Sequence, residues 1–148
     1  MEEFPHIKNA PESEVEWFEA LVALARYLRG PDGCPWDRKQ TSADFVRFLR
    51  EEAEELSEAY VLNSTHGMRE EWGDTFFCML AAAAAAETEG RFTLREALRA
   101  AHEKMVRRHS HVFGPVTAET PEDAVHAWNA IKAQEQNGLG QRQDGQDA

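Results

Sequence analysis

The chain has 148 residues, of which 42% are hydrophobic, and this is enough for one globular domain with its own core. Its 27 acidic and 16 basic residues give a net charge of -11. The chain therefore lacks the general basic surface that supplies most of the affinity for nucleic acid, and it is poorly suited to anionic membranes. A substrate that carries phosphates would need recruited cations, so a divalent metal is the leading expectation.

Neither cysteine usage nor hydropathy indicates a secreted or membrane protein. The two cysteines, Cys34 and Cys78, lie far apart and form no CxxC pair, which favours two reduced thiols. Residues 1–5 are acidic and show no signal peptide, and the longest apolar run, residues 75–86, is too short for a membrane span. We therefore expect a cytoplasmic protein.

Hydrophobic spacing predicts five helices and no strand. The predicted spans are 13–30, 42–62, 68–89, 93–108 and a last helix from 120 onward. Ser13 with Glu16, and Thr93 with Glu96, have the spacing of capping boxes. Pro121 stands at the favoured first position of the last helix. The expected fold class is an all-α helical bundle.

The bundle is expected to be one domain over residues 13–136, after a flexible segment at 1–12. Residues 137–148 are mostly Gln, Gly and Asp, which predicts a disordered tail. Residues 76–86 are apolar on all sides and include six consecutive alanines, which predicts a helix that is buried all round. One short chain can hardly surround such a helix, so we expect a homodimer or a dimer of dimers in which dimerisation completes a four-helix core.

Two glutamates of the second predicted helix lie on its apolar side. At about 100° per residue, Glu52 falls in the middle of the apolar arc and Glu55 on its edge, whereas Glu54 and Glu58 point toward water. An unpaired buried charge costs several kcal/mol, and a metal ion is the natural compensation.

The third predicted helix supplies two more carboxylates on one face, Glu71 and Asp74. Four carboxylates on two neighbouring helices would form an oxygen-only site suited to Mg²⁺ or Mn²⁺. The alternative is that these glutamates are ordinary solvated faces. The inward position of Glu52 weakens this alternative, but the pattern alone leaves both interpretations open.

A basic cluster follows in the fourth predicted helix, where Lys104, Arg107 and Arg108 share a broad face. These residues could form a phosphate clamp, or they could simply be cations favoured by the helix dipole near a C-terminus. Trp36 and Trp128 are the candidates for stacking on a base, and core packing is an equally good explanation for each.

His109 and His111 lie in a turn before Gly114. No cysteine, third histidine or HExxH partner is nearby, so we favour a capping or structural role over zinc ligation.

These residues together resemble the MazG nucleotide pyrophosphohydrolases. The pattern Glu51-Glu52-x-x-Glu55 followed by Glu71-x-x-Asp74 is similar to the EExxE and ExxD metal motif of that family. Three further segments resemble its other signatures: Cys34-Pro35-Trp36-Asp37-x-x-Gln40-Thr41, Lys104-x-x-Arg107-Arg108-His109 and Trp128-x-x-Ile131-Lys132. The likeness covers about residues 28–135, and the ordered set is specific although EExxE alone is weak.

The resemblance implies a role for each matching residue. Glu52, Glu55, Glu71 and Asp74 would be metal ligands, and Glu51 would be a possible base or further ligand. Lys104 and Arg107 would hold phosphates, and Trp128 would lie near the nucleoside. Three departures from the family pattern are Ser110 in place of proline, and Thr75 and Cys78 in place of aliphatic residues. None of them removes a ligand.

The implied reaction is hydrolysis of a nucleoside triphosphate at the α–β phosphoanhydride, NTP + H₂O → NMP + PPi, with Mg²⁺ as cofactor and Glu51 or Glu55 as general base. Narrower alternatives are a dUTP, dCTP or phosphoribosyl-ATP pyrophosphatase. A di-iron carboxylate bundle would need Glu-x-x-His pairs on its helices, and the predicted helices have none. A non-catalytic helical dimerisation module is the remaining alternative.

Overall fold

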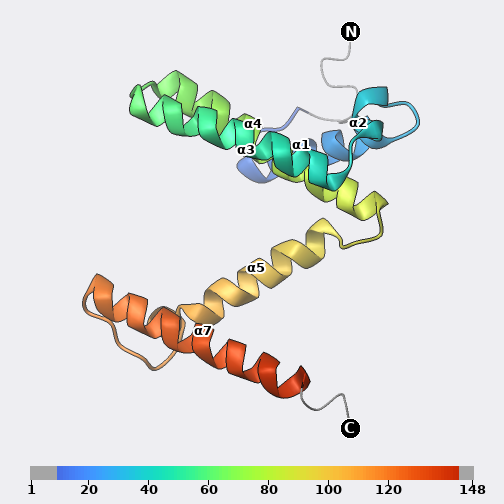
Figure 1. Cartoon of the computed structure of the whole chain (residues 1–148). Helices are drawn as coiled ribbons and strands as arrows, with labels where there is room; N and C mark the ends of the chain where they lie inside the picture. Colours follow the sequence, from blue (N-terminus) through green and yellow to red (C-terminus); the bar gives the residue numbers. More distant parts are fainter. Residues whose placement is uncertain (1–9, 144–148) are drawn as a thin grey trace. The chain divides into compact units, whose positions relative to one another are not determined.

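The computed structural model describes residues 10–143, with side chains as far as residue 139. This part of the chain forms helices and no strand, which confirms the predicted all-α class. It divides into two compact units, residues 1–94 and 95–148, and Figure 1 shows the helices of each. The sequence predicted one domain over residues 13–136, and that boundary stays a prediction.

Two short helices join the five that the sequence predicts. They are α2 (Pro35–Lys39) and α6 (Ser110–Phe113). Four or five residues are too few to show a 3.6-residue period, so hydrophobic spacing could not reveal them.

The first long helix, α1 (Glu14–Arg29), begins at the predicted capping box. The Ser13 hydroxyl accepts a hydrogen bond from the Glu16 backbone N–H at 3.3 Å, and the Glu16 carboxylate accepts one from the Ser13 backbone N–H at 2.9 Å. Thr41 and Asp44 form the same reciprocal pair before α3 (Ser42–Val61). These caps fix where each helix begins, and therefore which face each later side chain occupies.

A tight turn joins α3 to α4 (Thr65–Thr88), and the two helices run side by side in Figure 1. Asn63 has a φ of 52°, a left-handed conformation that Asn tolerates better than most residues. The Ser64 hydroxyl accepts a hydrogen bond from the Gly67 backbone N–H at 3.1 Å, so α4 starts three residues before the predicted position. Gly90, with a φ of 70°, follows the end of α4 as predicted.

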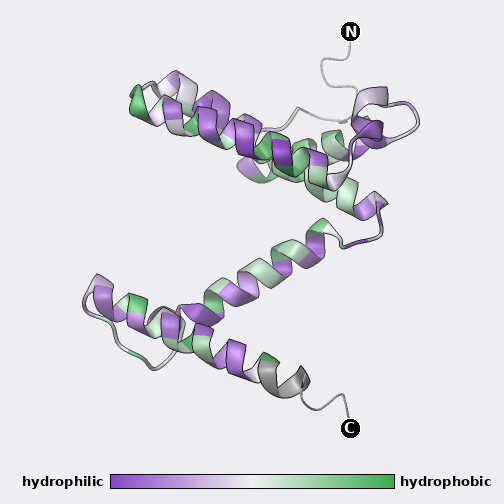
Figure 2. Cartoon of the chain, in the orientation of Figure 1, coloured by the Kyte–Doolittle hydropathy of each residue, from purple (hydrophilic) through white to green (hydrophobic). Residues whose placement is uncertain are grey.

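The core of the first unit forms where α1 and α3 pack against α4, and hydrophobic residues gather there in Figure 2. One buried cluster consists of Ala25, Leu80 and Ala84, and the other of Phe45, Ala81 and Ala85. The alanines of α4 are therefore covered by helices of the same chain. Small side chains let neighbouring helices approach closely, so the burial of these alanines does not require a second copy, and the homodimer stays a prediction.

Glu89, just after α4, ties that helix end to the start of α3. Its carboxylate accepts hydrogen bonds from the backbone N–H of Ser42 at 2.7 Å and from the Ser42 hydroxyl at 2.8 Å, and Arg91 pairs with it. These bonds, with the Ser42 backbone bond as the largest contribution, lower the pKa of Glu89 from 4.5 to about 2.

Acid should therefore weaken this tie. A carboxyl group with a depressed pKa in the folded state stabilises the fold above its unfolded pKa, and this contribution is lost as the pH falls through the folded pKa. We expect the melting temperature of the wild type to fall more steeply between pH 4.5 and 2 than that of Glu89→Gln. Thermal melts by circular dichroism measure this, with Glu58→Gln on the exposed side of α3 as control. Parallel curves for all three proteins would contradict the assignment.

The second unit contains nearly all of α5 (Leu94–Arg108), together with α6 and α7 (Pro121–Gln143), and α6 packs on α7. Thr120 and Asp123 cap the start of α7 reciprocally, at 3.1 and 3.2 Å. The helix continues to Gln143, which corrects the disordered tail predicted from residue 137. The Gln and Arg residues of this segment favour a helix, and composition alone had suggested otherwise. Residues 144–148, and residues 1–9 of the predicted flexible N-terminal segment, lie outside the described part.

Between residues 10 and 143, no helix combines the length and the hydropathy that a bilayer crossing requires.

Candidate metal centre

The centre is built on the face of α3 that turns toward α4. Residues three and four apart share a helix face, so Glu52 continues the row that Phe45 and Phe48 begin. Glu52 is half-buried and Glu55 is exposed, as their predicted positions in the middle and on the edge of the apolar arc require. Glu51 is also exposed.

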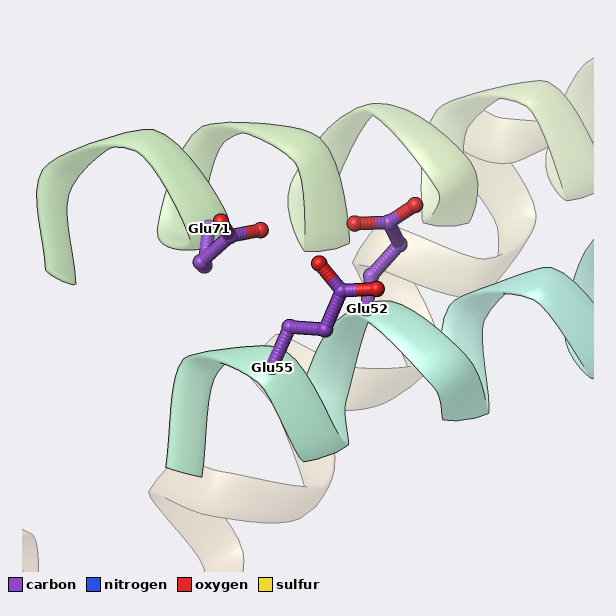
Figure 3. Close-up of side chains that lie close together, drawn as sticks. All are labelled: Glu52, Glu55 and Glu71. Carbon is purple, nitrogen blue, oxygen red and sulfur yellow. The ribbon is translucent and has the colours of Figure 1, made fainter. Parts of the chain in front are cut away.

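The turn at Asn63 brings α4 back along α3, and this places Glu71 opposite the two glutamates. Figure 3 shows the side chains of Glu52 and Glu55 on one helix and that of Glu71 on the other, with their carboxylates gathered between the helices. One carboxylate oxygen from each of the three residues lies within 4.8 Å of the others. This is the cluster that the sequence predicted, without its fourth member, Asp74.

The negative charges of the cluster act on one another. Burial raises the pKa of Glu52 most, followed by the charges of Glu55, Asp74 and Glu71. The pKa of Glu71 is raised as well, first by desolvation and then by Glu55 and Asp74. Asp74 therefore belongs to the electrostatic environment of the three carboxylates. Within the described residues, none of these four side chains has a basic partner.

A divalent cation fits this arrangement. Carboxylate oxygens are the donors that hard cations such as Mg²⁺ and Mn²⁺ prefer, and a cation would relieve the mutual repulsion that raises these pKa values. Such a cation could be held by Glu52, Glu55 and Glu71, with Asp74 nearby.

Thr75 and Cys78, which replace aliphatic residues of the family pattern, have polar or charged groups near them or leave polar groups buried. The pKa of the Cys78 thiol is raised by burial and then by the charges of Glu52 and Asp74. The Thr75 hydroxyl is buried and has no hydrogen-bond partner among the described residues. The spacing of four residues from Asp74 to Cys78 was the available signal, since it places both on one helix face.

Trp36 of α2 packs on the face of α3 that also carries Glu52, nearer the start of that helix. Its ring centroid is 5.5 Å from that of Phe48 and 6.2 Å from that of Phe45. Phe48 is four residues before Glu52, about one helical turn. The indole packs on the rings of Phe45 and Phe48, and because 53% of Trp36 remains exposed, it still offers surface to a ligand.

The basic cluster lies in the second unit, and two of its three cations are paired. The guanidinium groups of Arg107 and Arg108 contact Glu135 of α7 at 2.6 and 2.8 Å. The sequence did not predict this pairing, because 27 or 28 residues separate the partners. Lys104 is exposed, and among the described residues its amine has no salt bridge or hydrogen bond.

Trp128 is packed rather than open. The guanidinium carbon of Arg108 lies 5.2 Å from the centroid of its ring, and the His109 ring meets it edge-on, also at 5.2 Å. These contacts agree with the core-packing alternative for Trp128 and with a structural role for His109.

Comparison with known proteins decides what the motif pattern suggested. The family model described as the MazG nucleotide pyrophosphohydrolase domain matches residues 40–113, which is half of the chain and includes all the acidic residues of the centre. The chain belongs to the MazG family. A solved structure of a MazG-related protein from Thermotoga maritima agrees, with a TM-score of 0.67 and 30% identity over 78% of this chain and 98% of the other.

Two curated relatives are longer than this MazG chain. A MazG nucleoside triphosphate pyrophosphohydrolase/pyrophosphatase of Thermotoga maritima is 42% identical over 80% of the chain and 45% of its own length. The Bacillus subtilis protein YabN, described as uncharacterized, is 42% identical over 81% of the chain and 24% of its own length. The chain thus spans less than half of either relative. Trp36 and Trp128 lie outside the segment that the family model matches.

Proposed function

We propose that this MazG protein hydrolyses nucleoside triphosphates to a nucleoside monophosphate and pyrophosphate, with Mg²⁺ as cofactor and Mn²⁺ as a possible substitute. The observation that carries the proposal is the cluster of Glu52, Glu55 and Glu71, whose oxygens lie within 4.8 Å of one another inside the family-matched segment. A cytoplasmic role in removing unwanted nucleotides is part of the proposal.

The chemistry asks little of the protein beyond positioning and charge. When bound, the divalent ion neutralises the triphosphate and makes water a better nucleophile. Glu52, Glu55 and Glu71 hold it, with Asp74 as a further ligand. Glu51 or Glu55 takes the proton as the water oxygen bonds to the α-phosphorus, while the bond from that phosphorus to the bridging oxygen breaks and pyrophosphate leaves.

A panel of nucleotides tests the proposal. Pyrophosphate release is measured for the common and damaged ribo- and deoxyribonucleoside triphosphates, each with and without Mg²⁺. Broad, Mg²⁺-dependent release supports the proposal. Activity confined to dUTP, dCTP or phosphoribosyl-ATP would point to the narrower alternatives. No release from any of them, with no thermal stabilisation by Mg²⁺, would favour the non-catalytic dimerisation module.

Of the two candidate tryptophans, Trp36 and Trp128, Trp36 is the better candidate for stacking on the base. It is half-exposed, and it packs against Phe48 one turn from Glu52. The ring of Trp128 packs against Arg108 and His109, and we propose for it a supporting place near the nucleoside.

The clamp proposed from Lys104, Arg107 and Arg108 should act mainly on substrate binding. Lys104→Ala and Arg107→Ala are each expected to raise KM, or to lower kcat/KM, by roughly tenfold, because their cations would meet phosphates rather than the metal. Arg99→Ala, which removes another exposed arginine of α5 that pairs with Glu103, is the control and should change little. Steady-state kinetics measure the effect. Unchanged kinetics in both variants would indicate that these cations only interact with the helix C-terminus and with Glu135, and bind no phosphate.

We also propose that the active unit is a homodimer or a dimer of dimers. The described residues include no large side chain that is fully buried, and several large apolar residues are more than half exposed, among them Tyr60, Val61, Leu62, Trp72 and Met79. Such surfaces often mark protein interfaces. Light scattering at micromolar concentration measures the mass, and an active monomer would refute this part of the proposal.

A further inference from the structure

Arg29, the last residue of α1, binds the short helix α2 through backbone oxygens. Its Nη1 donates to the carbonyl oxygens of Asp37 at 2.7 Å and Gln40 at 3.0 Å, and its Nη2 donates to the Thr88 hydroxyl at 3.2 Å. The last carbonyls of a helix lack the regular i+4 backbone donor, although the Gln40 N–H reaches the Asp37 carbonyl at 3.1 Å. The Arg29 side chain, which is partly buried, supplies donors to the end of α2 and connects it to the end of α4.

A second arginine makes the reverse connection. Arg38 of α2 donates from Nη1 to the carbonyl oxygens of Gly30 and Pro31, at 3.0 and 2.5 Å, in the turn that follows α1. The Cys34 backbone N–H donates to the Leu28 carbonyl at 2.8 Å. A helix of five residues has little stability of its own, so the position of α2 depends on contacts of this kind.

The position of α2 in turn determines where Trp36 lies. Trp36 is on α2, and its carbonyl accepts a hydrogen bond from the Gln40 side chain at 3.1 Å. Its indole reaches Phe48, one turn from Glu52, and keeps 53% of its surface exposed. A displacement of α2 would therefore move the aromatic surface that packs on α3 one turn before Glu52.

We propose that Arg29 is a positioning residue for nucleotide binding, acting through α2 on Trp36. This inference rests on the proposed function, in which Trp36 stacks on the base. Arg29 touches neither the carboxylates nor the proposed reacting atoms. Its loss should therefore weaken substrate binding and leave the chemical step nearly unchanged.

Arg29→Lys tests this, because lysine keeps the charge but lacks the planar fork that bridges two carbonyls and a hydroxyl. We expect KM to rise roughly tenfold and kcat to stay within about twofold. The matched control is Arg26→Gln, which breaks the bidentate pair of Arg26 with Glu87 at 2.9 and 3.0 Å between α1 and α4. It should leave KM unchanged. Equal KM changes in the two variants would reduce Arg29 to a general structural role.

A double-mutant cycle with Trp36→Ala tests the route of the effect. If Arg29 acts through Trp36, then Arg29→Lys should raise KM little further once the indole is absent. Fully additive changes would overturn the proposed route. Arg38→Lys loosens the same corner from an exposed position, so it should reproduce the rise in KM if Arg29→Lys does not fold.

A readout without substrate separates this inference from the proposed function. The emission of Trp36 is obtained as the difference between each protein and its Trp36→Phe derivative. In Arg29→Lys this difference spectrum should shift to longer wavelength and be quenched more readily by acrylamide, and in Arg26→Gln it should not. If the wild type hydrolyses no nucleotide, the proposed function fails but this measurement still reports on α2. An unchanged Trp36 spectrum in Arg29→Lys would overturn the positioning role.

Discussion

Glu52→Gln is expected to lower nucleotide turnover by roughly a thousandfold while the helical fold is kept. The amide keeps the shape of the side chain but loses its charge. Glu52 lies within 4.8 Å of Glu55 and Glu71, measured between their carboxylate oxygens, and it is the most buried of the glutamates on α3. Pyrophosphate release at saturating Mg²⁺ measures turnover, and circular dichroism checks the fold. Glu54→Gln, at an exposed position on the same helix, should keep full activity.

The same substitution should stabilise the metal-free protein. Burial, and then the charge of Glu55, raise the pKa of Glu52, so ionisation of this residue opposes folding. A carboxyl group with a raised folded pKa contributes stability below its unfolded pKa, and that contribution is lost as the pH rises through the folded pKa. At pH 7 we therefore expect a higher Tm for metal-free Glu52→Gln than for wild type, and a smaller increase on adding Mg²⁺. Near-native activity with an equal response to Mg²⁺ would contradict the proposed centre.

Gly33→Ala should lower the free energy of unfolding by about 3 kcal/mol, because the corner between α1 and α2 has no room for a methyl group. A Cβ at Gly33 would lie 2.3 Å from the carbonyl oxygen of Tyr27 and 2.4 Å from that of Leu28. Both are backbone atoms, and the Leu28 carbonyl already accepts from Cys34. Relief of the clash therefore requires the chain to move. Urea unfolding curves measure the loss.

Gly73→Ala is the matched control, and the opposite sign is expected. A Cβ at Gly73 would meet no heavy atom within 4 Å, and alanine is favoured over glycine in a helix interior by about 1 kcal/mol. The two variants add the same methyl group, so only its surroundings differ. A similar loss of stability in both would show that the close approach at Gly33 is not the cause.

Capping and stop signals in the sequence predicted where several helices begin and end. The capping pair at Ser13 and the glycine stop at Gly90 depend on residues within one turn, and both are found. The position of Glu52 could also be predicted, because helical period fixes its face relative to Phe45 and Phe48. The short turn after α3 then makes α4 run back antiparallel along α3.

Contacts between distant segments could not be read from the sequence. Arg107 and Glu135 are 28 positions apart on two different helices, and no local pattern selects one partner for an arginine. The burial of the α4 alanines was predicted correctly, but composition does not say which helix covers them. The burial of these alanines does not by itself require a second copy, because α1 and α3 already pack on them.

The small residues between α3 and α4 have a consequence for ion selectivity. On one side of the carboxylates, a Cβ at Gly67 would be 3.3 Å from that of Ala59, and on the other side Phe45 packs on Ala81 and Ala85. These small residues lie outside the acidic cluster and allow the two helices to approach closely. The oxygen distances that suit Mg²⁺ and Ca²⁺ differ by only about 0.4 Å. If the proposed centre binds a divalent ion, enlarging one of these side chains should move the helices apart, so we expect alanine and glycine positions outside the acidic motif to influence which ion is preferred.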